Sequence, residues 1–127
     1  MKYLSTAYTY FSISGKYLDP DNFLDIFDIA STRVGEGQQG EKFLEYKIEA
    51  KDANEGLEEA IYKLMKSLAP KSQKIKAYAS HRDLYIKIFV VIHVKNAESN
   101  GVFLNKHFIK FLNEIGAEIE IDTYNYS

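Results

Sequence analysis

Three carboxylates alternate near the end of the chain, and they are the residues most able to do chemistry. Glu118, Glu120 and Asp122 are each separated by one residue, which places them on one face of a β-strand. Such a row can bind a cation or contact a basic protein. The alternative is a solvated strand face whose charges oppose association between sheets.

The other residue types that support catalysis or metal binding are scarce or badly spaced. No two of the three histidines, His81, His93 and His107, have the i,i+2 strand spacing or i,i+4 helix spacing of a metal site. The chain has no cysteine and no Gly-x-Ser-x-Gly motif, which excludes a cysteine nucleophile and a nucleophile elbow. We therefore expect no metal, no cofactor and no catalytic residue, and the sequence favours a protein that is not an enzyme.

Tyrosine is the unusual feature of the composition, since there are ten tyrosines and no tryptophan. A tyrosine ring with its polar tip suits a wet binding surface, although such rings also cover sheet edges and the rim of a core. The net charge is −2, and Arg33 and Arg82 are the only arginines. Nucleic-acid-binding surfaces need clustered basic residues, so we do not expect a nucleic-acid partner.

The length of 127 residues predicts a single domain over residues 1–127. No stretch approaches the ~20 apolar residues of a membrane span. The first residues lack the apolar core, roughly 7–15 residues long, of a signal peptide. We therefore predict a cytoplasmic protein that does not bind membranes.

The segment from Leu84 to Lys95 is the most apolar and most β-branched of the chain. Its residues alternate between an apolar face and a mixed face, which predicts the middle strand of a sheet. The segments 7–14, 44–50 and 117–124 alternate in the same way and predict three more strands.

Four segments have the apolar spacing of helices. Asp19 and Pro20 predict the start of the first, which should end near Ser31. A second helix is expected from Leu57 to Leu68, after a capping box of Asp52 and Glu55. A short helix should end at His81, and a last one should run from about 104 to 115. The glycine-rich segment 35–40 predicts a mobile surface loop, because no helix start follows it to bind phosphate.

These elements predict an α+β fold, a two-layer sandwich with helices on one face of a four-stranded, mostly antiparallel sheet. The first expectation for strand order is ferredoxin-like, with the first and third strands in the middle.

If the apolar strand faces point to the helices, the other face of the sheet presents aromatic side chains with charges around them. Protein interfaces have this arrangement of an aromatic centre and a polar rim. An RNA-binding sheet also exposes aromatic residues, but it needs a basic surround. The predicted partner-binding residues are Tyr8, Tyr10, Lys87, Phe89, His93, Glu118, Glu120 and Tyr124.

Two motifs carry a family resemblance. The opening Tyr-Phe-Ser-Ile-Ser-Gly of residues 10–15, followed by Leu18-Asp19-Pro20, and the closing segment 111–124, Phe-Leu-Asn-Glu-Ile-Gly-Ala-Glu-Ile-Glu-Ile-Asp-Thr-Tyr, resemble an uncharacterised bacterial domain-of-unknown-function family. The resemblance covers nearly the whole chain and brings no catalytic residues. Small bacterial proteins of this kind often lie in gene neighbourhoods rich in secreted toxins, so the resemblance implies an immunity protein as one role.

The leading hypothesis is therefore a non-enzymatic protein-binding domain, an immunity protein that neutralises a toxin through a basic partner surface. Two alternatives stay open. One is a small-molecule sensor or unrecognised enzyme, with a polar pocket between sheet and helices near the glycine loop or His93. The other is a structural protein whose open sheet face forms a homodimer interface.

Overall fold

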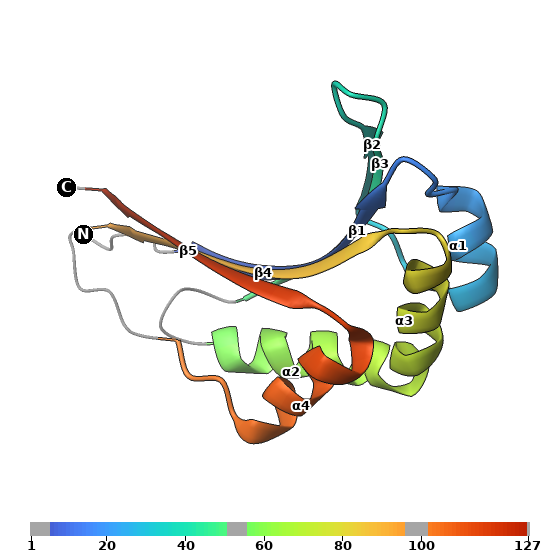
Figure 1. The fold of residues 1–127 in the computed structure, drawn as a ribbon. Coiled ribbons are helices and arrows are strands. Elements are labelled where there is room, and N and C mark those ends of the chain that lie inside the picture. Colours follow the sequence, from blue (N-terminus) through green and yellow to red (C-terminus); the bar gives the residue numbers. More distant parts are fainter. Residues whose placement is uncertain (1–5, 51–55, 96–101, 127) are drawn as a thin grey trace.

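The computed structural model describes residues 6–50, 56–95 and 102–126. One sheet of five strands, in the order β2-β3-β1-β4-β5, carries helices on one side. Figure 1 shows that the sheet is strongly curved, with α2, α3 and α4 against its convex side and α1 beside α3 at one end. The elements in chain order are β1 (Thr6–Gly15), α1 (Pro20–Phe27), β2 (Arg33–Glu36), β3 (Lys42–Glu49), α2 (Leu57–Leu68), the 3-10 turn η1 (Ala69–Lys71), α3 (Ser72–His81), β4 (Tyr85–Lys95), α4 (Lys106–Ile115) and β5 (Glu118–Tyr126).

The core lies between the convex side of the sheet and the helices. Alternate residues of β1 and β4, such as Phe11 and Ile88, are fully buried there, because an alternating strand places all its apolar residues on one face. Helix residues such as Leu64 and Phe108 are fully buried against them. The hydroxyl of the buried Thr9 donates a hydrogen bond of 2.8 Å to the carbonyl oxygen of Phe89, which satisfies it inside this layer.

The prediction of an α+β fold with a mostly antiparallel sheet is confirmed, since β4 and β5 are the one parallel pair among the described strands. The expected count of four strands is wrong, because β2 forms a fifth. Its four residues include Gly35 and are exposed or half-buried, so they lack the alternating apolar pattern that marks a strand.

The expected ferredoxin-like strand order is not the order observed. The first and third predicted strands, β1 and β4, do lie side by side in the interior of the sheet. β1 is the middle strand of the five, so the Leu84–Lys95 segment is interior but not central. β5 pairs directly with β4 after α4, whereas a split β-α-β unit has another strand between its two strands. β3 is also a direct neighbour of β1, but the two strands are antiparallel.

Three of the expected helix ends are confirmed, since α2, α3 and α4 end at Leu68, His81 and Ile115. The first helix, α1, begins as expected but ends early. The side chain of Asp19 accepts a hydrogen bond from the Asn22 amide and caps α1. This helix ends at Phe27, earlier than expected, because Asp28 adopts a left-handed conformation with φ of 50° and the Lys71 ammonium donates to the carbonyl oxygen of Phe27. The capping box expected at Asp52 and Glu55 lies outside the described residues.

Within residues 6–50, 56–95 and 102–126, no helix has both the length and the apolar character to cross a lipid bilayer.

Candidate functional site

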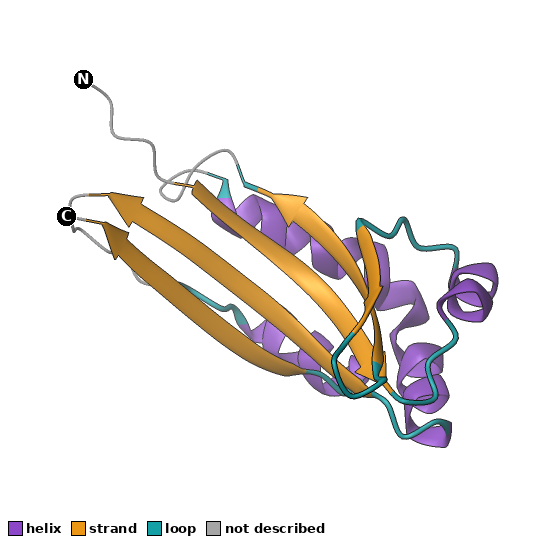
Figure 2. Ribbon diagram, turned by 90° about the horizontal axis from the view of Figure 1, so that it is seen from above, coloured by secondary structure: helices purple, strands orange, loops and turns teal. Residues whose placement is uncertain are grey.

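The concave side of the sheet, which no helix covers, is termed the open face (Figures 1 and 2). The strand register brings all of the predicted partner-binding residues onto it. Tyr10 lies opposite Phe89 of β4, and Phe89 lies opposite Glu120 of β5. Residues paired across a sheet share a face, and so do alternate residues of one strand. The other predicted residues follow from the same register and alternation: Tyr8 on β1, Lys87 and His93 on β4, and Glu118 and Tyr124 on β5.

Five rings on the open face form a continuous row, termed the aromatic row. Tyr10 stacks on Phe89 with ring centroids 4.4 Å apart and planes 12° apart. At the other end, Tyr124 stacks on His93 at 4.9 Å and 14°. Tyr8 joins the two pairs, since its centroid lies 6.1 Å from Tyr10 and 6.2 Å from His93. The row therefore crosses from β5 through β4 to β1 as one rigid, partly apolar surface.

Two lysines flank the aromatic row. The Nζ of Lys47 lies 5.0 Å from the ring centroid of Tyr8, and the Nζ of Lys87 lies 5.3 Å from that of Phe89. Each ammonium also pairs with a carboxylate, Lys47 with Glu49 at 3.4 Å and Lys87 with Glu120 at 3.1 Å. Both cations are thus held in place by their contacts with rings and carboxylates.

Carboxylates outnumber cations along β5. The hydrogen bond from Lys87 is the main reason that the pKa of Glu120 lies below its usual value. The pKa of Asp122 is raised instead, first by the loss of hydration and then by the hydrogen bond and negative charge of Glu120. Among the described residues, Glu118 and Asp122 make no ion pair. This side of the open face therefore has unbalanced negative charge that a cation would relieve.

The hydroxyl of Tyr10 is the most strongly shifted group of the open face. Burial, together with the nearby negative groups, Glu45 first among them, raises its pKa to about 12. Tyr10 is therefore a neutral hydrogen-bond donor at any physiological pH and cannot act as a general base.

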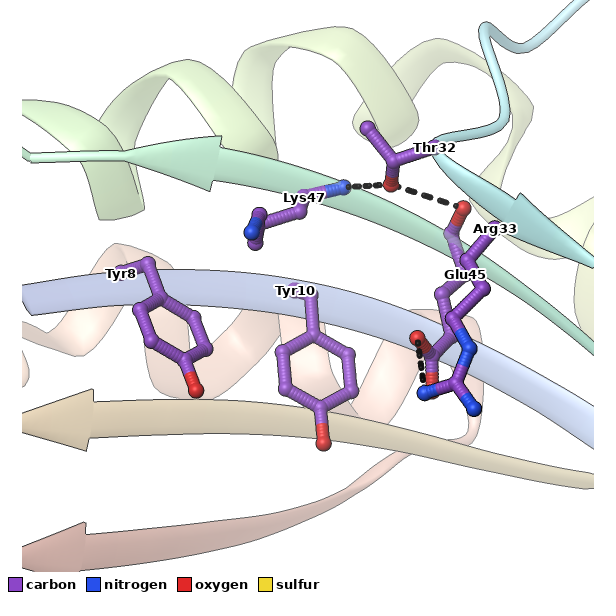
Figure 3. A pocket seen from close by; sticks show the side chains of 6 residues that line it. All are labelled: Tyr8, Tyr10, Thr32, Arg33, Glu45 and Lys47. Carbon is purple, nitrogen blue, oxygen red and sulfur yellow. Dashed lines mark hydrogen bonds and ion pairs between the residues drawn. The ribbon is translucent and has the colours of Figure 1, made fainter.

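A shallow hollow of about 300 Å³ lies on the open face beside β2 (Figure 3). In Figure 3 the rings of Tyr8 and Tyr10 extend from β1 toward β4, with Lys47 on one side of the hollow and Arg33 with Glu45 on the other. The Arg33 guanidinium is 3.9 Å from the Glu45 carboxylate. Thr32, which also lines the hollow, accepts a hydrogen bond from the Lys47 amide and donates one to the Glu45 carbonyl.

This hollow lies on the outer surface of the sheet, whereas the pocket expected for a sensor or enzyme lies between sheet and helices, near the glycine loop or His93. The three histidines lie on different elements, His81 in α3, His93 in β4 and His107 in α4, and the ring of His93 is part of the aromatic row.

Sequence reasoning missed several members of the open face. Glu45, Lys47 and Glu49 lie opposite Ser12, Tyr10 and Tyr8, and their alternation in β3 was a usable signal for the same face. Arg33 had no such signal, because its strand is too short to show a period. Glu118, Glu120 and Asp122 of β5 are termed the acidic row. The predicted partner-binding residues include the first two but not Asp122.

Taken together, the fold and surface define a class, a two-layer α+β domain with a concave open sheet face of stacked rings and charged side chains. The chain belongs to the family described as "Domain of unknown function (DUF4279)", which matches residues 5–126. The expectation of an uncharacterised domain family is thereby confirmed. Comparisons with curated proteins and with solved structures found no match.

Proposed function

We propose that this chain is a non-enzymatic protein-binding domain that holds a basic protein partner on its open face. The observation that carries the proposal is the aromatic row bordered by the acidic side of β5. Interfaces concentrate binding energy in aromatic residues at their centre, and opposite charge at the rim steers association and selects the partner.

The biological role we propose is that of a cytoplasmic immunity protein that blocks a toxin. A toxin that cleaves nucleic acid needs a positively charged surface to attract phosphate. The carboxylates of β5 complement such a surface and repel nucleic acid itself. The proposal therefore assigns the acidic side of the open face to a partner with a positively charged surface.

The test begins with affinity capture from the native lysate, identification of the captured protein and its purification. Its affinity is then measured by calorimetry against the wild type and a double variant of the open face, Tyr124→Ala with Glu120→Gln. Tyr124 is 48% exposed, so its truncation leaves the core intact. We expect a partner with a basic isoelectric point and a loss of affinity of about tenfold or more.

A matched control removes the same two residue types from the helix side. Tyr62 on α2 is 51% exposed, and Glu59 pairs with Lys63 at 3.3 Å, much as Glu120 pairs with Lys87. The variant Tyr62→Ala with Glu59→Gln should bind the partner as the wild type does. Equal affinity of all three proteins would refute the open face as the site, and a wild type that only captures itself would replace the proposal with a homodimer.

The hollow beside β2 favours a second candidate, small-molecule binding. Its two cations, two tyrosine hydroxyls and single carboxylate would suit a small anionic ligand. A thermal-shift screen of organic anions separates the candidates, because only this one predicts a rise in melting temperature that Arg33→Gln abolishes.

A further inference from the structure

The two edges of the sheet differ in length and protection. β2 forms one edge with four residues, and β5 forms the other with nine. Figure 2 shows β5 as the outermost strand along one long side of the sheet. An edge strand presents a row of backbone N–H and C=O groups that the sheet itself does not pair.

β5 lacks most of the features that prevent another strand from pairing with an edge. It has no proline, no glycine and no lysine. Its parallel register with β4 runs without interruption from Glu118 to Tyr126, so no bulge turns the edge away. Of these features β5 keeps only charged side chains, the acidic row. Negative charge opposes pairing with another acidic strand but not with a basic one.

The two faces of β5 set the chemistry of a strand that could join it. On the open face, Glu118, Glu120 and Asp122 alternate. On the helix side, Ile119 is half-buried and Ile121 is 44% exposed. A sixth strand beside β5 would therefore meet carboxylates on one face and an isoleucine surface on the other.

We propose that an extended segment of the basic partner, with lysine or arginine at alternate positions and apolar residues between them, adds to β5 as a further strand. This inference rests on the proposed function, since it specifies how the same partner binds. Alternate residues of a strand are about 6.6–6.8 Å apart, so basic side chains at i, i+2 and i+4 match the spacing of the three carboxylates.

A second copy of this chain fits the edge less well. Two β5 strands paired edge to edge would continue the open face from one copy to the other, with acidic row beside acidic row. Like charges on neighbouring strands are destabilising. The same row therefore rejects self-pairing and selects a basic segment.

The test uses a synthetic nine-residue peptide, the length of β5, in which lysine alternates with valine. A second peptide has the same sequence with every backbone nitrogen methylated, which keeps the charges and removes the N–H donors. A third has glutamate in place of lysine. The readouts are affinity, by titration followed by NMR, and amide hydrogen exchange of β5 in the full chain.

We expect the lysine peptide to bind and to slow exchange at alternate amides of β5. The methylated peptide should bind at least about tenfold more weakly, and the glutamate peptide should not bind. Replacing Glu118→Gln and Asp122→Asn should also weaken binding, whereas the matched pair Glu58→Gln and Asp25→Asn on the helix side should not.

Two outcomes overturn strand addition. If the lysine and methylated peptides bind equally and β5 exchange is unchanged, the contact involves side chains alone and the proposed function stands without the edge. If the lysine peptide fails to bind at about 1 mM, the edge is not a docking site, while the titration of the purified partner decides the proposed function independently.

Discussion

At the scale of single residues, Tyr10 connects the structure of the open face to a measurable property. Its ring stacks on Phe89 at 4.4 Å, and burial raises the pKa of its hydroxyl from 10.0 to about 12. The folded state thus holds the neutral phenol, whereas the unfolded chain ionises it at its ordinary pKa.

This difference predicts the sign of a pH effect. Because the folded-state pKa is raised, Tyr10 contributes stability that is fully present below the unfolded pKa of 10.0 and is lost as the pH rises toward about 12. In Tyr10→Phe that contribution is absent. Urea unfolding at about pH 9 and about pH 11.5 should therefore show a smaller fall in the free energy of unfolding for Tyr10→Phe than for the wild type. Equal falls in the two proteins would show that the hydroxyl titrates normally in the folded state.

At the scale of elements, the β2–β3 pair depends on one glycine. Gly35 lies opposite Phe43, and a Cβ at Gly35 would overlap the Phe43 ring. The Arg33 guanidinium lies 5.0 Å from the centroid of that ring, so the ring lies against two residues of β2. This packing orients Arg33 at the edge of the hollow.

Gly35→Ala should therefore destabilise the protein by about 0.5–1.5 kcal/mol, the cost of turning the half-buried Phe43 ring away from its preferred rotamer. In a Phe43→Ala background the ring is absent, and the same substitution should cost less than about 0.5 kcal/mol or even stabilise the strand. Denaturant unfolding of the four proteins gives the coupling energy between the two positions. A coupling near zero would contradict the contact.

The same pair shows where sequence reasoning about elements stops. Long alternating segments such as β1 and β4 are predictable, because burial of one face imposes period two along their whole length. β2 is not, because its four residues are exposed or half-buried and too few to show a period. Strand order is likewise set by contacts between distant segments, which explains why β5 joined β4 and not the place that a ferredoxin-like order would give it.

The open face was likewise predictable where alternation along one strand decides it, and not where contacts between strands decide it. Period two was sufficient to predict that Tyr8, Tyr10 and Phe89 share a face. It did not predict the stacking of His93 between rings of different strands, since that depends on the register of β1, β4 and β5. The contribution of Arg33 also depended on a strand that the sequence does not reveal.

At the scale of the whole molecule, the distribution of charge matters more than the total. The net charge is only −2, yet three carboxylates lie together along the exposed edge strand β5. If this row prevents edge-to-edge pairing, its removal should change the association state of the protein and leave its fold intact.

The triple variant Glu118→Gln, Glu120→Gln and Asp122→Asn should therefore self-associate through β5. Sedimentation velocity should show a mean mass that rises with concentration from that of the monomer toward twice that value. The control triple variant, Asp25→Asn, Glu58→Gln and Glu59→Gln, changes the net charge equally on exposed helical positions. We expect both this control and the wild type to stay monomeric. Self-association of both variants would assign the effect to net charge, and monomeric behaviour of both would show that backbone geometry, not the acidic row, protects the edge.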